Sequence, residues 1–458
     1  MKKVWYVCTI SLIAALGGLL FGFDTAVISG AEKTIQSLFK LNGFWHGFTI
    51  SIALIGTLIG VLVAGRPADI FGRKKVLFAV AFFFGIAALG SALSHNWFTF
   101  LFFRFIGGLA VGASSVIAPT YIAEITPARI RGRLVASFQL NIVAGILLSY
   151  FSNYWISQLI TVESWRWMLG IQVIPSAIFF CLIFIIPESP RWLVIKNNES
   201  KAKTLLKKFG SDDAEQELTD IKESLQNSQK VHGEKLFSYV YKMPILLAFL
   251  VAVFNQLSGI NAVMYYAPRI FELVGYAKKS ALLQSISIGL ALFLFTIVGM
   301  LLIDRVGRKK LLLTGSLGMM FFLGMVAKTI FSTVNGSIWM LVYMIGFIAF
   351  FAFSQGTVIW VFISEIFPNT VRAKGQAFGS FTHWTMAVFI SWLFPILAES
   401  SSKGGGIAFT IFAVTAAIQF IVVFMFFPET KGKSLEEIQK DFSPARHMND
   451  KTINTSVT

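Results

Sequence analysis

The sequence Gly65-Arg66-Pro67-Ala68-Asp69-Ile70-Phe71-Gly72-Arg73-Lys74-Lys75 joins two apolar runs and returns as Asp304-Arg305-Val306-Gly307-Arg308-Lys309-Lys310 between two later runs. Two further patterns repeat in the same order. Glu124 through Arg131 has the spacing of Glu365 through Arg372, and PESPR at 187–191 is matched by PETKG at 428–432. Matches at corresponding places and in one order indicate an internal repeat, so the chain is predicted to consist of two similar halves.

The composition indicates that the bilayer surrounds most of this chain. Of the 458 residues, 55% are hydrophobic and only 14% are charged, whereas a soluble chain averages about 25% charged residues. Apolar runs of about 20 residues are typical of membrane-spanning helices. They cover approximately residues 5–29, 44–65, 76–94, 97–121, 134–156, 166–187, 243–271, 281–303, 310–331, 337–364, 376–398 and 406–427. The first run is too long for a signal peptide and has no clear cleavage site, so it is predicted to be a retained span.

These runs predict an all-α membrane protein with twelve transmembrane helices in two pseudo-symmetric six-helix bundles. The bundles are expected at 1–187 and 243–427. Between them, 188–242 is polar and carries apolar residues at helical spacing, which predicts a linker of short amphipathic helices at the membrane surface. The tail, 428–458, is predicted to hold one helix at Leu435–Lys440 and a disordered end.

The basic residues predict the orientation. The net charge is +16, and Lys and Arg gather in alternate loops, as they do on the cytoplasmic side of multi-pass proteins. The repeated loops, the linker and both termini are therefore expected to be cytoplasmic, in the cytoplasmic membrane. Because the cytoplasmic loops account for the positive charge, binding of nucleic acid is not expected. Cys8 and Cys181 both lie in apolar runs, so neither a disulfide framework, a metal site nor a cofactor is expected.

One carboxylate stands alone inside the first apolar run. Asp24 has no other charged residue near it until Glu32, and a charge at mid-membrane costs about 2.5–3.5 kcal/mol on insertion scales. It must therefore face a wet cavity or a basic partner, and Arg104, also inside an apolar run, is the natural candidate. The pair is predicted either to couple a proton to transport or to act only as a static link between two helices.

The repeated loops suggest a cytoplasmic gate. A carboxylate at one helix end and cations at the start of the next can form networks that hold a face shut and break when it opens. Simple positive-inside anchoring accounts for the cations but not for the repeated Asp and Gly. The predicted gate residues are Asp69, Arg73, Glu124, Arg131, Asp304, Arg308, Glu365 and Arg372.

Taken together, the motifs resemble those of the sugar-porter family of the major facilitator superfamily. They are the two GRK loops, the two E-x6-R pairs, PESPRWL at 187–193, NQLSGINAVMYYAP at 255–268 and PETKGK at 428–433. The resemblance runs over nearly the whole chain. Within the family it points to bacterial xylose–proton and glucose–proton symporters, and more distantly to facilitative glucose transporters. It implies that a hexose or pentose is carried by alternating access.

The polar and aromatic positions fit a sugar. Amide side chains donate and accept hydrogen bonds, as sugar hydroxyls require, and aromatic rings cover the apolar ring face. Asn255, Gln256 and Asn261 lie in one span, in a helix that Gly259 is expected to break. By resemblance, Gln139, Gln256 and Asn261 match sugar-binding positions. Tyr265 matches a residue that gates the outer side, and Trp360 matches one that stacks on the sugar. Trp384 and Phe21 match weaker aromatic contacts. Contacts between helices are the alternative role for the amides, and packing is the alternative for the aromatics.

Three residues depart from the family pattern. Asn255 stands where relatives usually have a second glutamine, and Leu292 stands where an asparagine is common. His383 replaces an amide before Trp384. Asn255 and His383 are kept as candidate sugar contacts, and the three departures leave the choice of sugar open.

By resemblance, an aspartate at position 24 marks proton-coupled members of the family. The prediction is therefore a sugar–proton symporter that works as a monomer and is not an enzyme. A facilitative uniporter and a transporter-like sugar sensor are the alternatives, although the sensors usually carry a longer cytoplasmic tail. A channel would need a repeated filter. An enzyme would need clustered nucleophiles, bases or metal ligands, which five scattered His and two Cys do not supply.

Overall fold

The computed structural model describes residues 2–210, 213–230, 235–332, 338–368, 370–433 and 437, and all structural statements below refer to these residues. Regular structure in this part of the chain is entirely helical. Twelve of the described helical stretches are long and apolar enough to cross a membrane, which confirms the predicted all-α membrane fold. Apart from Glu437, the predicted tail helix at Leu435–Lys440 and the disordered end lie outside the described residues.

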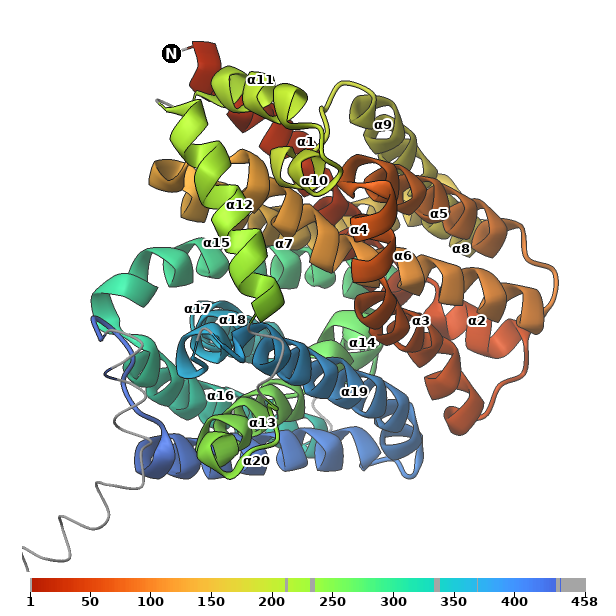
Figure 1. Ribbon diagram of the computed structural model, residues 1–458. Helices are drawn as coiled ribbons and strands as arrows, with labels where there is room; N and C mark the ends of the chain where they lie inside the picture. Colours follow the sequence, from red (N-terminus) through yellow and green to blue (C-terminus); the bar gives the residue numbers. More distant parts are fainter. Residues whose placement is uncertain are drawn as a thin grey trace, which may run out of the picture.

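The helices form two groups and a connecting segment, which Figure 1 shows with the first group above the second. The first half consists of α1 (Lys2–Val27), η1 (Ile28–Gly30), α2 (Glu32–Leu38), α3 (Gly43–Val63), α4 (Gly65–Phe71), α5 (Arg73–Leu93), α6 (Trp97–Ile125), α7 (Ala128–Leu159), α8 (Ser164–Gly170) and α9 (Val173–Ile183). The linker forms α10 (Pro190–Ile195), α11 (Glu199–Phe209) and α12 (Ala214–Lys230). The second half consists of η2 (Tyr239–Tyr241), α13 (Lys242–Leu257), α14 (Ile260–Glu272), α15 (Lys278–Val306), α16 (Arg308–Phe331), α17 (Ile338–Phe353), α18 (Gln355–Ile366), α19 (Arg372–Glu399) and α20 (Gly404–Phe426).

Three of the spans are interrupted. The break between α13 and α14 was expected at Gly259, which has a φ of +81° that glycine adopts without steric cost. The breaks between α8 and α9 and between α17 and α18 were not expected. At the second of these, Ser354 has φ −108° and ψ −91°. Such breaks free backbone groups in the membrane, which is tolerated where the backbone is buried in protein.

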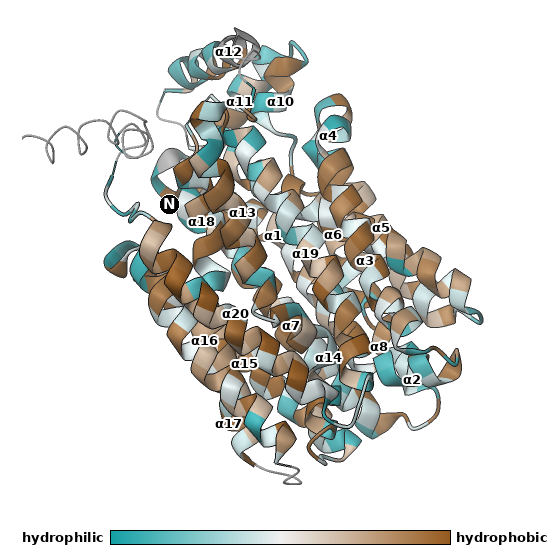
Figure 2. Cartoon of the chain, turned by 90° about the horizontal axis from the view of Figure 1, so that it is seen from below, coloured by the Kyte–Doolittle hydropathy of each residue, from teal (hydrophilic) through white to brown (hydrophobic). Residues whose placement is uncertain are grey.

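The two ends of the molecule are different. We call the end with α4 and α10–α12 the linker face and the end with η1 and α2 the α2 face; Figure 2 shows them at opposite ends of the long helices. Between the faces, large apolar side chains such as Phe102 and Leu294 are more than 40% exposed on the outer surface. Such an apolar belt is what a bilayer requires of the surface that it contacts.

The apolar core shows how the halves meet. One continuous cluster contains residues of both halves, including Phe23, Tyr150 and Met264. Two further clusters do not cross between the halves. One lies around Tyr121 and Phe179 of the first half and includes Phe209 of the linker, and the other lies mainly on α13, α16, α18 and the ends of α15 and α20. The halves also pack through α3 on α19 and α7 on α15. The two halves therefore share one apolar core along part of the molecule, and each has a separate core elsewhere.

The repeated loops have a common construction that connects two of the sequence repeats. The Glu188 carboxylate accepts hydrogen bonds from the backbone N–H groups of Arg73 (3.0 Å) and Lys74 (3.2 Å) at the start of α5. In the same way, Glu429 accepts from the N–H groups of Arg308 (2.9 Å) and Lys309 (3.2 Å) at the start of α16. A carboxylate at a helix N-terminus satisfies unpaired donors and favours the helix dipole.

The glycines in these loops leave room for that carboxylate. Gly72 and Gly307 have φ values of +97° and +99°, and a Cβ atom at either position would collide with the side chain of Glu188 or Glu429. The glycine of each GRK loop and the glutamate that follows each half are therefore parts of one arrangement, which explains why both repeat.

Candidate functional site

The structure brings Asp24 and Arg104 together in the first half. Asp24 lies on α1 and Arg104 on α6, and Arg104 Nη1 donates to Asp24 Oδ1 at 2.9 Å. The residues are only 4% and 3% exposed, so neither faces the acyl chains. Nε and Nη2 of Arg104 have no hydrogen-bond partner among the described residues. The buried pair therefore rests on one direct hydrogen bond. Protonation of Asp24 would leave Arg104 without its negatively charged partner.

Most of the predicted sugar contacts form one connected group. The amide of Gln256 is at its centre: Asn261 Nδ2 donates to Gln256 Oε1 at 2.7 Å, and Gln256 Nε2 donates to Asn255 Oδ1 at 3.1 Å. Gln256 Nε2 also lies 3.1 Å from His383 Nε2. These side chains come from α13, α14 and α19. Their amides use both donors and acceptors, which is the chemistry that sugar hydroxyls require.

Aromatic rings extend this group across the two halves. The His383 ring lies 4.9 Å from Trp360 on α18 and 5.2 Å from Trp384 on α19, measured between centroids. Trp384 in turn lies 5.8 Å from Phe21 on α1 of the first half. Trp360 is 38% exposed, so part of its side chain beside His383 is accessible to a ligand. Aromatic side chains beside a few placed polar groups are typical of small-molecule sites.

The remaining candidates lie outside this chain of contacts. Tyr265 is 2% exposed on α14 and is close enough to Asp24 and Arg104 to interact electrostatically with both. Gln139 is partly buried on α7, and no described contact joins it to Gln256. Leu292 is buried in the apolar core on α15, so the position offers no polar atom to a ligand.

The structure adds one amide that the sequence reasoning missed. Gln355 begins α18, directly after the break at Ser354, and Asn255 Nδ2 donates to its backbone carbonyl at 3.4 Å. Its side chain is fully buried, and neither amide atom has a hydrogen-bond partner among the described residues. The sequence signal was weak because the glutamine lies within a long apolar run.

The predicted gate residues lie on the linker face, and each ion pair joins residues of one half. Arg73 pairs with Glu124 (3.0 Å) and Asp69 (3.2 Å). Arg308 pairs with Glu365 (2.7 Å) and Asp304 (3.3 Å) in the same pattern. Arg131 and Arg372 instead donate to backbone carbonyls, those of Thr126 (3.2 Å) and Phe367 (3.4 Å). A gating role for the eight residues stays a prediction.

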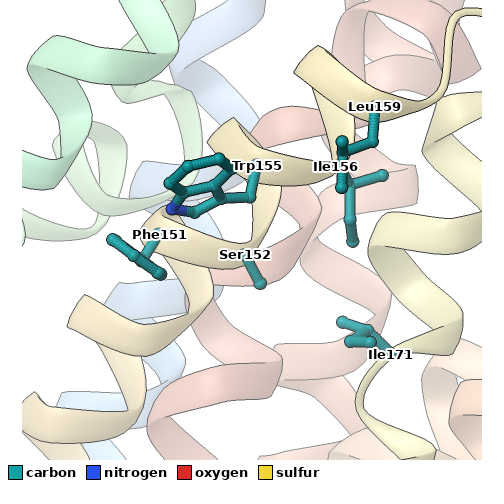
Figure 3. A pocket seen from close by; sticks show the side chains of 6 residues that line it. All are labelled: Phe151, Ser152, Trp155, Ile156, Leu159 and Ile171. Carbon is teal, nitrogen blue, oxygen red and sulfur yellow. The ribbon is translucent and has the colours of Figure 1, made fainter.

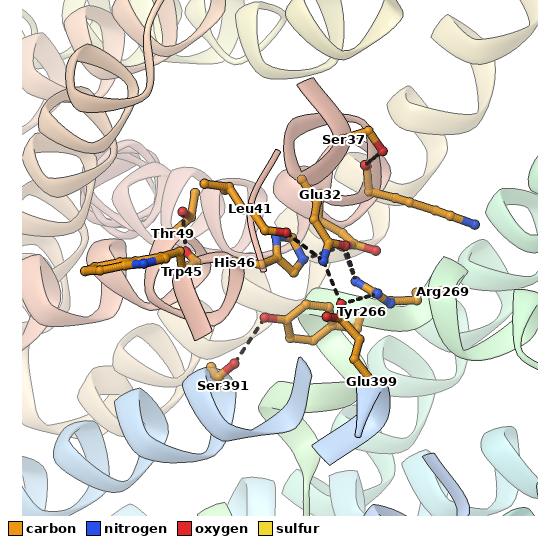
Figure 4. Close-up of polar contacts among 12 residues, drawn as sticks. Glu32, Ser37, Leu41, Trp45, His46, Thr49, Tyr266, Arg269, Ser391 and Glu399 are labelled. Atoms are coloured by element: carbon orange, nitrogen blue, oxygen red, sulfur yellow. Dashed lines mark hydrogen bonds and ion pairs between the residues drawn. The ribbon is translucent and has the colours of Figure 1, made fainter. Parts of the chain in front are cut away.

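A second network, which the sequence reasoning missed, crosses between the halves at the α2 face (Figure 4). Arg269 on α14 donates to Glu32 Oε2 at 3.2 Å and to Glu399 Oε1 at 2.6 Å. Glu32 Oε2 also lies 2.7 Å from His46 Nε2 on α3. Nearby, the indole N–H of Trp392 donates to the carbonyl of Phe44 at 3.0 Å. These contacts hold the halves together at this face.

The hollow in Figure 3 is a different feature. It lies on the outer surface of α7, between Phe151, Ser152, Trp155, Ile156 and Leu159, and is completed by Ile171. Phe151 and Trp155 are each 48% exposed, and Ser152 supplies the only side-chain hydroxyl of the lining. The hollow therefore lacks the polar groups of a sugar site. Among the described residues, no group of three His, Cys, Asp or Glu side chains could hold a metal ion.

The chain is similar to known proteins over most of its length. A family model described as "Sugar (and other) transporter" matches residues 10–442. The arabinose-proton symporter of Bacillus subtilis (strain 168) is 39% identical over 443 residues, which cover 95% of each chain. The inward open conformation of the xylose transporter XylE from E. coli superposes with a TM-score of 0.84 at 36% identity, covering 96% of this chain and 100% of that one.

A second structure of the xylose transporter superposes less well. The proton:xylose symporter XylE bound to 6-bromo-6-deoxy-D-glucose gives a TM-score of 0.78 at 35% identity, covering 96% of this chain and 99% of that one. The better agreement is therefore with the inward open form. With a family model that matches most of its length, the chain belongs to the sugar (and other) transporter family.

Proposed function

We propose that the chain is a proton-coupled symporter of a hexose or pentose that works by alternating access across the cytoplasmic membrane. The linker face is then cytoplasmic, together with both termini, and the α2 face is outside. Residues 1–187 and 243–427 move as two bodies about the linker at 188–242, and the tail at 428–458 lies in the cytoplasm. The unit of transport is one chain in the lipid bilayer.

The observation that carries the proposal is that one helix joins the two candidate sites. Phe21 and Asp24 lie three residues apart on α1, a spacing that places both on one side of a helix. Phe21 contacts Trp384 of the second half at 5.8 Å, whereas Asp24 pairs with Arg104 inside the first half at 2.9 Å. A change at the carboxylate can therefore reach the sugar site through α1.

The chemistry of the sites assigns a role to each group. Gln256, Asn261 and Asn255 bind sugar hydroxyls, with His383 and Gln139 beside them. Trp360, Trp384 and Phe21 cover the apolar face of the ring, and Tyr265 closes the site toward the α2 face. Asp24 takes up a proton from outside, which frees Arg104, and loses it inside. One elementary charge that crosses 100 mV supplies about 2.3 kcal/mol, enough for roughly 50-fold sugar accumulation.

The deciding experiment replaces the proton-binding carboxylate. In proteoliposomes with an imposed proton gradient, Asp24→Asn is expected to abolish accumulation of labelled sugar and to retain counterflow exchange, because the sugar site stays intact. Glu163→Gln is the matched control: it removes a carboxylate that is 59% exposed and that, among the described residues, pairs with Arg166 alone, so accumulation should persist. Accumulation that survives Asp24→Asn, or that is insensitive to a protonophore in the unsubstituted chain, would instead identify a facilitative uniporter.

A further inference from the structure

The inter-half network at the α2 face contains a buried histidine that the proposed transport mechanism does not use. His46 on α3 is fully buried, and its Nε2 lies 2.7 Å from Glu32 Oε2. Its other ring nitrogen, Nδ1, has no hydrogen-bond partner among the described residues. The ring edge packs against Tyr266 at 5.9 Å between centroids. A histidine is the side chain whose charge changes most readily near neutral pH.

Glu32 contacts two groups that can carry a positive charge. Its Oε2 atom contacts both His46 on its own half and Arg269 of the second half, at 2.7 and 3.2 Å. The Glu32 side chain is only 2% exposed, and a buried carboxylate needs a cation or several hydrogen bonds. In the closed arrangement Arg269 supplies that positive charge, so His46 can serve as a neutral donor.

The other charged groups around the pair are already partnered. Arg269 also binds Glu399 on α19 at 2.6 Å, and Gln36 on α2 donates to the same carboxylate at 2.7 Å. Lys33 forms an ion pair with Glu272 across the halves. Tyr266 donates its hydroxyl to the carbonyl of Ser391 at 3.1 Å. Arg269 is thus the group whose position decides the charge balance at Glu32.

We propose that the His46–Glu32 pair is a second proton-binding site, which takes up a proton from the aqueous phase at the α2 face when Arg269 withdraws and releases it when Arg269 returns. The inference rests on the alternating access and orientation of the proposed function, but not on the proton carried by Asp24. Arg269 and the proton are alternative positive partners of the same carboxylate.

Which residues move together decides whether a proton favours the open or the closed form. When the α2 face opens, Arg269 and Glu399 leave with the second half, and Glu32 and His46 stay on the first. Lys33 also stays on the first half, but its side chain lies at the exposed edge of the network, 60% exposed, and not against the buried Glu32 carboxylate. Glu32 then has no cation in contact with its carboxylate, and water reaches Nδ1. A proton that binds Nδ1 makes an imidazolium whose Nε2–H still faces Glu32, with no other bond changed. On closure the Nδ1–H group would lose its partner and a second cation would approach, both of which disfavour the imidazolium.

External acid is therefore expected to favour the form that is open at the α2 face. For one proton, the ratio of open to closed molecules changes by at most about tenfold per pH unit. This would return the empty carrier to the outside more often when protons are abundant there.

The test measures the opening of the α2 face against pH. Spin labels at Val162→Cys and Trp339→Cys place one probe on each half, at side chains that are 76% and 58% exposed. Cys8 and Cys181 are replaced by Ser. All variants carry Asp24→Asn, so that the titration of that carboxylate is removed. The distance distribution is recorded in nanodiscs between pH 5 and 8.

In the Asp24→Asn chain the open fraction should rise as the pH falls, and adding His46→Gln, which keeps a donor for Glu32, should remove this dependence. Glu32→Gln should also remove it, which covers the case in which the histidine variant fails to fold. His95→Gln, at an exposed histidine of the same face, should retain it. Two results would overturn the second site: a pH dependence of the open fraction that survives His46→Gln, or no pH dependence in the Asp24→Asn chain. The second of these results would leave the symport proposal standing.

Discussion

The two faces of the molecule use the same kinds of side chain for different purposes. At the linker face, Arg73 and Arg308 bind carboxylates of their own halves. At the α2 face, Arg269 binds Glu32 of the other half and Glu399 of its own. Both arrangements are partly buried arginine–carboxylate networks. Of these pairs, only Arg269–Glu32 joins the two halves and must break when they separate. Its free energy therefore contributes directly to the balance between conformations.

This difference shows what an ion pair can tell about a transporter. A pair within one half stabilises that half in every conformation, whereas a pair between halves stabilises one conformation only. The intact pairs at the linker face are compatible with the inward open form of the xylose transporter, with which the chain superposes well. If these residues gate the linker face, they do so through contacts that another conformation forms.

The largest effect is expected from Arg269→Leu. The substitution leaves Glu32 and Glu399 without their shared cation, and breaking a buried pair costs about 3–5 kcal/mol. The Arg269–Glu32 pair joins the two halves and so exists only when the α2 face is closed, whereas the Arg269–Glu399 pair lies within the second half. The loss of the Glu32 pair should therefore raise the ratio of open to closed molecules at least roughly 100-fold. The distance between spin labels at residues 162 and 339 measures this shift.

Arg166→Leu is the matched control on the same face. Arg166 is similarly buried, but it donates to the carbonyls of Ala92 (2.7 Å) and Ser94 (2.8 Å) within the first half. Its replacement should lower the thermal stability without a change in the open fraction. Equal shifts for both arginines would contradict the distinction between pairs within and between halves.

A smaller effect concerns the carboxylate that binds the start of α5. Burial raises the pKa of Glu188 above its ordinary value, although the N–H groups of Ser189, Lys74 and Arg73 oppose the shift. A raised pKa in the folded state means that the stability is fully present below the unfolded pKa and declines as the pH rises through the folded value.

Glu188→Gln removes this titration. The melting temperature of the variant, relative to that of the unsubstituted chain, should therefore increase between pH 4 and pH 7. A relative melting temperature that falls over this range would show that the N–H groups and the Arg73 charge outweigh burial, and that the loop at the linker face is stabilised by the charged form.

Much of the fold could be predicted because a bilayer leaves few alternatives. An apolar run of about 20 residues in lipid has to satisfy its backbone internally, so its length and composition predict a helix. The short helices α2 and α4 were missed because they lie where the apolar runs end. The break at Gly259 had a residue that predicts it, whereas Ser354 itself is no such signal.

The site was predictable where a residue contrasts with its surroundings. Asp24 and Arg104 are single charges in apolar runs, and their contact followed from that contrast. The family motifs also predicted a transporter and not an enzyme, which membership of the family confirms. The Glu32–Arg269 contact had no such signal, because Glu32 and Arg269 lie near the ends of spans, where charges are ordinary, and because the contact depends on the conformation.

The smallest effect is expected at the outer edge of the same inter-half network. Lys33 pairs with Glu272 across the halves, but the lysine side chain is 60% exposed. Exposed pairs contribute only about 0.2–1 kcal/mol and are screened by salt. Lys33→Ala should therefore change the open fraction by less than about fivefold, and the change should vanish in 1 M salt. The shift caused by Arg269→Leu should persist there, because water and ions do not reach the buried carboxylate of Glu32. A Lys33 effect as large as that of Arg269 would mean that crossing between the halves, and not burial, sets the strength of each contact.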